Sequence, residues 1–321
     1  MSEKILNSGE KTATRDAYGK ALVKLGGENR DIVVLDADLS KSTKTADFAK
    51  VFPERFFNMG IAEQNLIGFS AGLAASGKVP FASTFAVFAT GRAFEQIRNS
   101  VAYPKLNVKV AATHAGISVG EDGASHQAIE DIAVMRSLPN MTVLVPADAQ
   151  ETYQVIKKAA EYQGPVYIRM GRLAVPVLFD ETYNFKIGQA NIVRDGKDAT
   201  VFAIGLMVHE AIKAAEELSS QGIEIAVVNC ASIKPIDREM VIRMAKQTGA
   251  VVTAEEHTII GGLGSAVAEI LSENYPVHMA RVGIKDVFGE SGKPDELLVK
   301  YGLTYSEIIK AVKDVLAKKQ S

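Results

Sequence analysis

Short apolar runs alternate with longer amphipathic stretches along nearly the whole chain. In the first half, the runs DIVVLDAD, NVKVAATHAG, MTVLVPAD and GPVYIRMGR are separated by helical patterns. Buried parallel strands are apolar on both faces and are joined by crossover helices, so this order predicts a parallel sheet covered by helices. The expected strands are 31–38, 107–116, 141–148 and 164–172, and the expected helices are 12–28, 61–76, 91–101 and 148–162.

A second series of the same kind follows the turn-rich segment RLAVPVLFDETYNFKIG at 172–188. The sequence therefore predicts an α/β protein with two doubly wound, mainly parallel sheet domains at 1–180 and 190–321, and a boundary near 175–190. In the second domain the expected strands are 198–207, 223–230, 249–257 and 277–284, and the expected helices are 208–220, 237–247, 264–273 and 304–318.

Composition and charge narrow the class of function. The chain has 321 residues, 47% hydrophobic and 23% charged, as is typical of a soluble globular protein. Its net charge of −2 is spread without basic clusters, which argues against nucleic acid or an anionic membrane as a partner. The single cysteine, Cys230, excludes an internal disulfide, and no zinc-ligand spacing is present. Without an apolar leader or a membrane-length apolar run, we expect a cytoplasmic protein that acts on small molecules.

One carboxylate, Glu63 in FNMGIAEQN, precedes a helix whose residues are small and apolar on nearly every face. It has an ordinary interpretation, as a first-turn glutamate with Gly60 as the N-cap. However, the segment NLIGFSAGLAASG predicts a buried helix, and buried glutamates are rare unless they are paired or used. Such a carboxylate is suited to proton exchange with a ring nitrogen of a cofactor.

A loop with two of the five histidines follows the predicted strand 107–116. In THAGISVGEDGASHQ, His114 and His126 flank the acidic pair Glu121 and Asp122. Imidazoles bind sugar hydroxyls and phosphates, and the glycines of this loop allow close approach of the backbone to a ligand. The alternative is a polar surface loop, but its place at the carboxyl end of a strand favours a ligand site.

Two further stretches have competing interpretations. In STFAVFATGRAF, phenylalanines at 85, 88 and 94 are typical of core packing, or form a platform for a flat heterocycle. The glycines of GGLGS at 261–265 do not complete a dinucleotide-binding motif, because Val267 stands where the third glycine belongs. A tight loop leading into a helix is the better interpretation of that stretch.

Taken in order, DADLSKS, GIAEQN, STFAVF, GEDGASHQ, VPAD and GPVYIRMGR resemble the pyrimidine-binding domain of transketolases, and 190–321 resembles their C-terminal domain. The resemblance covers nearly the whole chain. It implies a thiamine-diphosphate-dependent transferase that moves a two-carbon ketol unit from a ketose phosphate to an aldose phosphate in the pentose phosphate pathway.

The resemblance also assigns site residues. Glu63 would hydrogen-bond the aminopyrimidine ring of the cofactor and favour its imino tautomer, and Phe85 and Phe88 would stack on that ring. Gly91 replaces the third aromatic residue of the family pattern. Asp38 and Leu39 match a segment near the cofactor. Glu63 and His126 are the predicted catalytic residues.

Substrate contacts carry over in the same way. His126 matches the histidine that contacts the donor hydroxyls, and Asp122 matches the aspartate that reads the acceptor's hydroxyl configuration. Arginine, imidazole and hydroxyl groups suit a phosphate. Apart from the resemblance, Arg15 has an ordinary interpretation as a solvated helix residue, Ser42 as a helix cap and Arg172 as a surface ion-pair partner. The positions that match the sugar-phosphate grip are Arg15, Ser42, His114 and Arg172.

A GDG motif with a downstream asparagine, which holds Mg²⁺ and the cofactor diphosphate in full-length transketolases, has no counterpart here. We therefore expect no metal ligand in this chain and an N-terminal partner subunit that supplies them, in a heterotetramer of two copies each. The resemblance gives the second domain a mainly structural and dimerising role, with His257 and Glu255–Glu256 lining an interface or acting structurally.

Three alternative functions share part of this pattern. Deoxyxylulose phosphate synthases share the AEQ and DGxxHQ patterns but carry a different residue at the position of His114. The beta subunits of 2-oxo acid dehydrogenases lack the GEDGxxHQ arrangement. A noncatalytic regulatory homologue is hard to reconcile with the joint presence of Glu63, His114, Asp122, His126 and Arg172.

Overall fold

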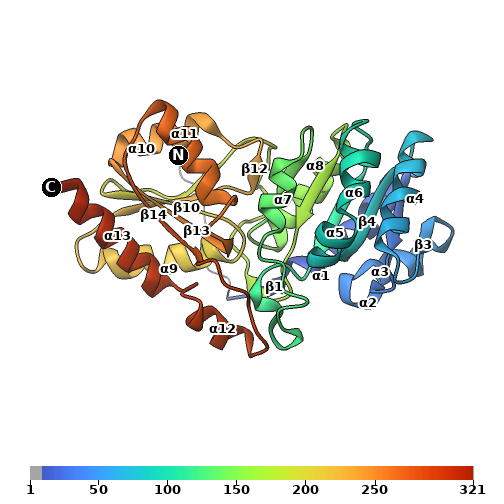
Figure 1. Cartoon of the computed structure of the whole chain (residues 1–321), viewed down its shortest axis with the longest axis horizontal. Helices are drawn as coiled ribbons and strands as arrows, with labels where there is room; N and C mark the ends of the chain where they lie inside the picture. The colour runs from blue at the N-terminus through green and yellow to red at the C-terminus, as the bar shows by residue number, and fades with distance from the viewer. Residues whose placement is uncertain (1–8, 321) are drawn as a thin grey trace.

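The computed structural model describes residues 9–320 and contains two α/β units that lie side by side along the longest axis of the molecule (Figure 1). One unit is built on a seven-stranded sheet and the other on a five-stranded sheet. The chain completes most of the first unit before it enters the second, as the change from blue and green to orange and red shows (Figure 1). The two mostly parallel sheets with covering helices confirm the predicted α/β class.

The seven-stranded sheet has the order β12-β6-β7-β5-β4-β2-β3, and its pairings are parallel except for the one between β12 and β6. Strands β2, β4, β5 and β7 are buried at every position, because helices cover both faces of the sheet. Its strands are β2 (Ile32–Asp36), β3 (Phe56–Asn58), β4 (Val79–Phe85), β5 (Lys109–Thr113), β6 (Thr142–Leu144), β7 (Val166–Arg169) and β12 (Ser232–Lys234).

Helices of several lengths connect these strands. They are α1 (Thr14–Glu28), α2 (Ser40–Thr43), α3 (Thr45–Val51), α4 (Glu63–Ala75), α5 (Ala86–Arg92), α6 (Phe94–Gln96), α7 (Asp131–Ser137) and α8 (Ala149–Glu161), with the 3₁₀ segments η1 (Pro53–Arg55) and η3 (Ile117–Asp122) and the π-helical segment η2 (Ile97–Ala102). A separate two-stranded sheet pairs β1 (Lys11–Ala13) with β8 (Ala174–Pro176).

The five-stranded sheet has the order β14-β13-β10-β11-β9, with only β9 antiparallel. All four strands and all four helices that the sequence predicted in this half are present. None of the helices in the described part of the chain combines the length and apolarity that a membrane span needs. The elements are β9 (Asn191–Arg194), β10 (Ala199–Ala203), β11 (Ile225–Asn229), β13 (Ala250–Thr258), β14 (His278–Ile284), α9 (Met207–Ser219), α10 (Arg238–Thr248), α11 (Leu263–Asn274), α12 (Pro294–Lys300) and α13 (Tyr305–Gln320).

The structure contains several short elements that were not predicted, and three differences from the sequence-based expectation bear on the site. Strand β4 lies between β2 and β5. It was not predicted, because proline, serine and threonine break its apolar pattern. The predicted helix 91–101 consists of three short pieces: the end of α5, then α6, then η2. Helix α4 begins at Glu63 with Ala62 as its N-cap, so the proposed Gly60 cap is wrong.

The burial of α4 was only partly anticipated. Leu66 and Ile67 are buried, but Phe69 is 43% exposed, and Gly68 and Gly72 have open space where a side chain would stand. One face of this apolar helix is therefore exposed in the single chain.

The two units share a strand. β12 follows β11 in the chain, yet it is hydrogen-bonded to β6 in the first sheet rather than to any strand of the second. The predicted domains 1–180 and 190–321 remain a prediction, and β12 lies beyond their boundary while completing the first sheet.

Candidate active site

The predicted site residues gather where the strands of the seven-stranded sheet end. Parallel strands place their carboxyl ends along one edge, which is where α/β proteins bind ligands. Strand β2 leads to Asp38 and Leu39, β4 ends at Phe85, β5 leads to His114, and β7 leads to Arg172. The absence of β4 from the prediction had hidden why Phe85 belongs to this edge.

Glu63 opens α4, and only 5% of its surface is exposed. In the first turn its carboxylate lies near the positive end of the helix dipole. Arg92 donates a hydrogen bond from Nη1 to Oε1 of Glu63 at 3.1 Å, and the Arg92 side chain is itself 54% exposed. The carboxylate is thus buried but reached from the outside by one cationic group.

An aromatic stack stands beside this ion pair. The rings of Phe85 and Phe88 lie nearly parallel, with centroids 5.8 Å apart and an interplanar angle of 15°. His114 stacks on Phe85 with a centroid distance of 3.8 Å, and the His126 ring meets Phe88 edge-on at 5.2 Å. The Arg92 guanidinium lies 4.2 Å from the centroid of Phe88, so it contacts both the carboxylate and the aromatic wall.

Arg15, Ser42 and His114 are brought together from three elements. Nη1 of Arg15, on α1, donates to the Ser42 carbonyl at 3.1 Å and lies 3.0 Å from Nε2 of His114. Burial, and then the charges of Arg15 and Arg172, lower the pKa of His114 to about 3. The ring is therefore neutral near pH 7: Nε2 accepts from Arg15, and Nδ1–H donates to the Thr113 hydroxyl at 2.8 Å.

The other arginine of this group is tied to the loop 116–123. Nη1 of Arg172 donates to the Val119 carbonyl, and it lies 3.5 Å from Glu121 and 3.9 Å from the Asp122 carboxylate. The charge of Arg172 also contributes to a lowered pKa of Arg15, after burial as the main cause. The two predicted phosphate-binding arginines therefore influence each other electrostatically.

The segment with Asp38 and Leu39 is held by a buried carboxylate. Asp36 accepts hydrogen bonds from the Leu39 amide at 2.5 Å and from the hydroxyls of Thr43 and Thr45, and burial raises its pKa. The Asn58 amide donates to the Asp38 carboxylate at 2.9 Å. Asp38 itself has a φ of 65°, a left-handed conformation that is uncommon outside glycine.

His114 has the same unusual backbone, with a φ of 57° directly after β5. Non-glycine residues hold such conformations where the surrounding structure fixes them, and they concentrate at functional sites. The left-handed turns at Asp38 and His114 therefore mark the same edge that the sequence motifs indicate.

Direct contacts connect most of the predicted residues into one cluster. They run from Leu39 and Ser42 through Arg15 and His114 to Phe85, and on through Phe88 and Arg92 to Glu63. Sequence reasoning missed Arg92, although it lies in the FATGRAF segment beside the aromatic positions. It also gave no ligand-related role to Glu256, which reaches the histidine loop from the second unit.

This arrangement suits an aminopyrimidine ring. A carboxylate can hold a ring nitrogen, and two near-parallel phenylalanines provide a wall on which a flat heterocycle stacks. No cluster of three or more His, Cys, Asp or Glu side chains in residues 9–320 could hold a metal ion. The cluster therefore offers groups that suit a flat, nitrogen-containing ring, and the described part of the chain has no metal-binding cluster.

The fold and the cluster together define a class of protein, in which a pyrimidine-binding α/β unit is joined to a second α/β unit. Residues 10–177 match the family description "Transketolase, pyrimidine binding domain", and residues 188–308 match "Transketolase, C-terminal domain". The chain belongs to the transketolase family.

Individual relatives agree with this assignment. A solved structure described as "Split gene transketolase, inactive beta4 tetramer" is 64% identical, covers 96% of this chain and 99% of its own, and has a TM-score of 0.90. A Methanocaldococcus jannaschii protein that carries the name of a transketolase C-terminal section is 54% identical, over 97% of this chain and 98% of its own. The "6-deoxy-6-sulfo-D-fructose transketolase subunit SqwH" of Clostridium sp. is 44% identical, over 95% of each chain.

Proposed function

We propose that this chain is the C-terminal subunit of a two-subunit, thiamine-diphosphate-dependent transketolase. With its partner it transfers a two-carbon ketol unit from a ketose phosphate to an aldose phosphate, as a cytoplasmic enzyme of the pentose phosphate pathway. The observation that carries the proposal is the joining of the buried Glu63, the stacked Phe85 and Phe88, and the Arg15–His114 pair in one cluster.

Each residue then has a distinct task. Glu63 holds and shares a proton at the pyrimidine ring nitrogen, and the wall of Phe85 and Phe88 orients that ring and excludes water. When bound, thiamine diphosphate supplies the electron sink that lets a carbon–carbon bond beside a carbonyl break. His126 binds hydroxyls of the donor near the reacting carbon, and Asp122 reads a hydroxyl of the acceptor.

A phosphate is proposed to bind at Arg15, Ser42, His114 and Arg172. Arg15 supports this assignment, because its buried Nε has no hydrogen-bond partner among the described residues. A buried guanidinium nitrogen left unpaired costs free energy, which an anionic ligand would recover. His114, which is neutral near pH 7, adds no charge and serves as a polar, orienting neighbour of Arg15.

The partner subunit is proposed to hold the diphosphate and Mg²⁺. Oxygen ligands are required for both, and the exposed apolar face of α4 suits burial against another subunit rather than water. On that face Phe69 is 43% exposed, and next to the helix Ile61 is 78% exposed. Two copies of each subunit would form the active heterotetramer. The solved relative described as an inactive beta4 tetramer supports a form of this chain that assembles alone and lacks activity.

Reconstitution tests this proposal. The purified chain, thiamine diphosphate and Mg²⁺ are expected to give no ketol transfer between a ketose phosphate and an aldose phosphate. Addition of a diphosphate-binding transketolase subunit encoded beside it should restore turnover, and size analysis should show two copies of each chain. Turnover by the lone chain would contradict the assignment of the metal and diphosphate site to the partner.

Calorimetry separates the catalytic proposal from a noncatalytic, regulatory homologue. Thiamine diphosphate should bind the assembled complex in the presence of Mg²⁺, and the Glu63→Gln complex should bind it more weakly, because an amide cannot share the ring proton. Formation of the complex without any cofactor binding would favour the regulatory alternative. Assays with pyruvate as the donor test the synthase and 2-oxo acid dehydrogenase alternatives.

A further inference from the structure

The loop with Asp122 and His126 is held largely from outside the sheet that carries it. It contains η3, which lies against α12 of the second unit, and Figure 1 shows the red α12 beside this green loop. The loop itself has little regular structure, since Gly120 breaks η3 with non-helical angles. Its conformation therefore depends on the groups packed against it.

Glu256, near the carboxyl end of β13, makes the most direct contact. Its Oε1 accepts a 2.6 Å hydrogen bond from the backbone amide of Ser118, and both residues are buried. Gly116 allows this approach: its φ is 83°, and a Cβ there would stand 2.2 Å from the Glu256 carboxyl carbon. The loop and the carboxylate are thus fitted to each other at a position that only glycine can occupy.

A second contact holds the other end of the loop. Nε2 of Gln127, which directly follows His126, donates to the Glu290 carbonyl at 2.9 Å and lies 3.2 Å and 3.3 Å from the carbonyls of Ile117 and Gly120. Gly289 leaves room for this amide, because a Cβ there would lie 1.9 Å from Oε1 of Gln127. Through Gln127, residues 289–290 therefore hold both ends of the loop against the second unit.

We infer that Glu256 and the 289–290 segment are positioning elements, through which the C-terminal unit sets the shape of the sugar-binding loop with Asp122 and His126. The predicted effect on substrate recognition rests on the proposed function, whereas the predicted effect on the conformation of the loop does not. The second unit thus has a role in substrate recognition beyond structural support and dimerisation. Neither element touches Glu63, Phe85 or Phe88 in the contacts described, so cofactor binding should be insensitive to them.

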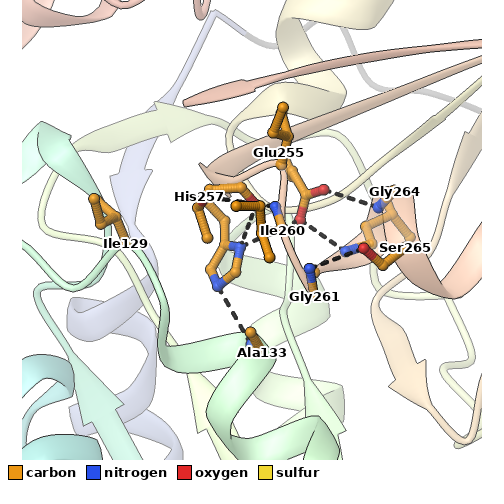
Figure 2. A network of polar contacts seen from close by, with 12 residues as sticks. Ile129, Ala133, Glu255, His257, Ile260, Gly261, Gly264 and Ser265 are labelled. Carbon is orange, nitrogen blue, oxygen red and sulfur yellow. Dashed lines mark hydrogen bonds and ion pairs between the residues drawn. The ribbon is translucent and has the colours of Figure 1, made fainter. Parts of the chain in front are cut away.

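The neighbouring His257 provides a matched control. It is buried in the same strand, and Figure 2 shows it between Glu255 and Ala133 in the first turn of α7. Its Nδ1–H donates to the Thr258 carbonyl at 2.7 Å, and its Nε2 accepts from the Ala133 amide at 3.3 Å. His257→Gln therefore disturbs the same boundary between the units without removing a loop contact.

Hydrogen exchange on the full chain tests the structural part directly. Glu256→Ala should speed amide exchange in residues 116–123 by roughly tenfold, because the buried acceptor of the Ser118 amide is gone. Glu256→Gln keeps an acceptor oxygen and should restore most of the protection, while His257→Gln should leave this segment unchanged. Equal exchange in Glu256→Ala and the unmodified chain would overturn the inference, whether or not the complex is a transketolase.

Kinetics of the assembled complex test the consequence. Glu256→Ala should raise KM for the sugar phosphates by roughly fivefold or more. Its kcat should stay within about twofold and its thiamine diphosphate affinity should be unchanged, because uniform binding is lost rather than transition-state stabilisation. Unchanged KM values in an active Glu256→Ala complex would overturn the role in recognition. An inactive unmodified complex would instead refute the proposed function and leave the exchange result standing.

Gly289→Ala provides an independent test if Glu256→Ala, a change at a buried residue, does not fold. Gly289 is partly exposed, and its added methyl would displace the Gln127 amide without deleting a buried charge. The same increase in loop exchange and in KM is expected. A matched change is Gly27→Ala on α1, where nothing lies within 4 Å of the added atom. Identical behaviour of the two variants would contradict the fastening role of residues 289–290.

Discussion

The two sheets end in polar residues of the same kinds but use them differently. At the carboxyl edge of the seven-stranded sheet, Asp38 and Asp122 are exposed and His126 is partly exposed. At the end of β13 in the five-stranded sheet, Glu255, Glu256 and His257 are almost completely buried. Both edges satisfy the rule that polar side chains follow parallel strands, yet only the first is open to a ligand.

The buried carboxylates of the second edge find hydrogen-bond donors within the protein. Glu255 accepts from the amides of Leu263 and Gly264 at the start of α11, and Asn229 at the end of β11 donates to Glu151 of the first unit at 2.8 Å. Buried charges need such partners. The comparison teaches that the exposure of the polar side chains, rather than strand position alone, separates a ligand site from a structural contact.

The largest expected effect comes from Glu63→Gln, which changes the first edge. The amide fills the same volume but cannot share a proton with a ring nitrogen, so turnover of the assembled enzyme should fall by roughly 10²-fold or more. Steady-state ketol transfer measures the loss, and size analysis should show normal assembly. Glu95→Gln on the exposed face of α6 is the control and should keep normal turnover. Near-normal rates for Glu63→Gln would remove this residue from the catalytic role.

Loss of Arg169, at the end of β7 but facing the second unit, should affect stability more than chemistry. Its Nε donates to the buried Asp131 carboxylate at 2.8 Å, and its Nη2 donates to the Glu256 carbonyl at 2.9 Å. Arg169→Met leaves a buried carboxylate unpaired and should lower the free energy of unfolding by about 3–5 kcal/mol, measured by chemical denaturation. Arg238→Met, which breaks an exposed pair with Glu273, should cost less than about 1 kcal/mol. Similar losses in both would contradict the buried-pair argument.

Glu151, which connects α8 to Asn229 of the second unit, should make stability depend on pH. Burial raises its pKa to about 7 from the usual value of 4.5. Because the folded state keeps the proton longer than the unfolded state, this contribution is full below about pH 4.5 and is lost as pH rises towards 7, by at most roughly 3 kcal/mol. In Glu151→Gln this part of the decrease in the free energy of unfolding between pH 5 and 7 should be absent. A series of denaturation experiments across this pH range at fixed salt measures it.

A second buried carboxyl limits how far the Glu151→Gln change can reduce the pH dependence of stability. Burial also raises the pKa of Glu256 to about 7, so Glu151→Gln should retain part of the decline in stability with pH. Asp180→Asn at the surface is unsuitable as a control because Asp180 has contacts of its own. Glu239→Gln, in the exposed first turn of α10, serves instead and should leave the slope unchanged. A slope that is the same in Glu151→Gln and the unmodified chain would refute the assignment.

Much of the fold could be predicted because most buried strands are uninterrupted apolar runs. β2, β10, β11 and β13 were found in this way, whereas the runs around β4 and the three-residue β12 carry too weak a signal. The pairing of β12 with the first sheet depends on contacts distant in sequence, which no local pattern encodes. The exposure of α4 was misjudged for a related reason: an apolar helix can be covered by a second chain as well as by its own.

The site could be predicted as a set of residues but not as a network. The order of the motifs singled out five residues, Glu63, Phe85, Phe88, His114 and Arg15. The structure places them in one cluster, and their roles remain predictions. The contact of Arg92 with Glu63 spans 29 residues, and that of Glu256 with Ser118 spans 138. Such partners become visible only when the fold brings their elements together.

The smallest expected effect, and the sharpest test of what an open edge means, concerns Arg92. Its guanidinium pairs with Glu63 and lies over the Phe88 ring, which are the two groups proposed to hold the pyrimidine. A ring that binds there must displace it. Because the Arg92 side chain is 54% exposed, the pair contributes at most about 1 kcal/mol, so Arg92→Gln should tighten thiamine diphosphate binding by less than about fivefold.

Calorimetric titration of thiamine diphosphate and Mg²⁺ into the assembled complex measures this change. Arg98→Gln is the control, since the Arg98 guanidinium donates to the neighbouring, exposed Asn99. The sign is informative. Tighter binding means that Arg92 occupies the ring site until the cofactor arrives, and the gain should shrink as salt weakens the ion pair. A tenfold loss of affinity would instead mean that Arg92 contacts the cofactor itself, and the first edge would then be less open than its geometry indicates.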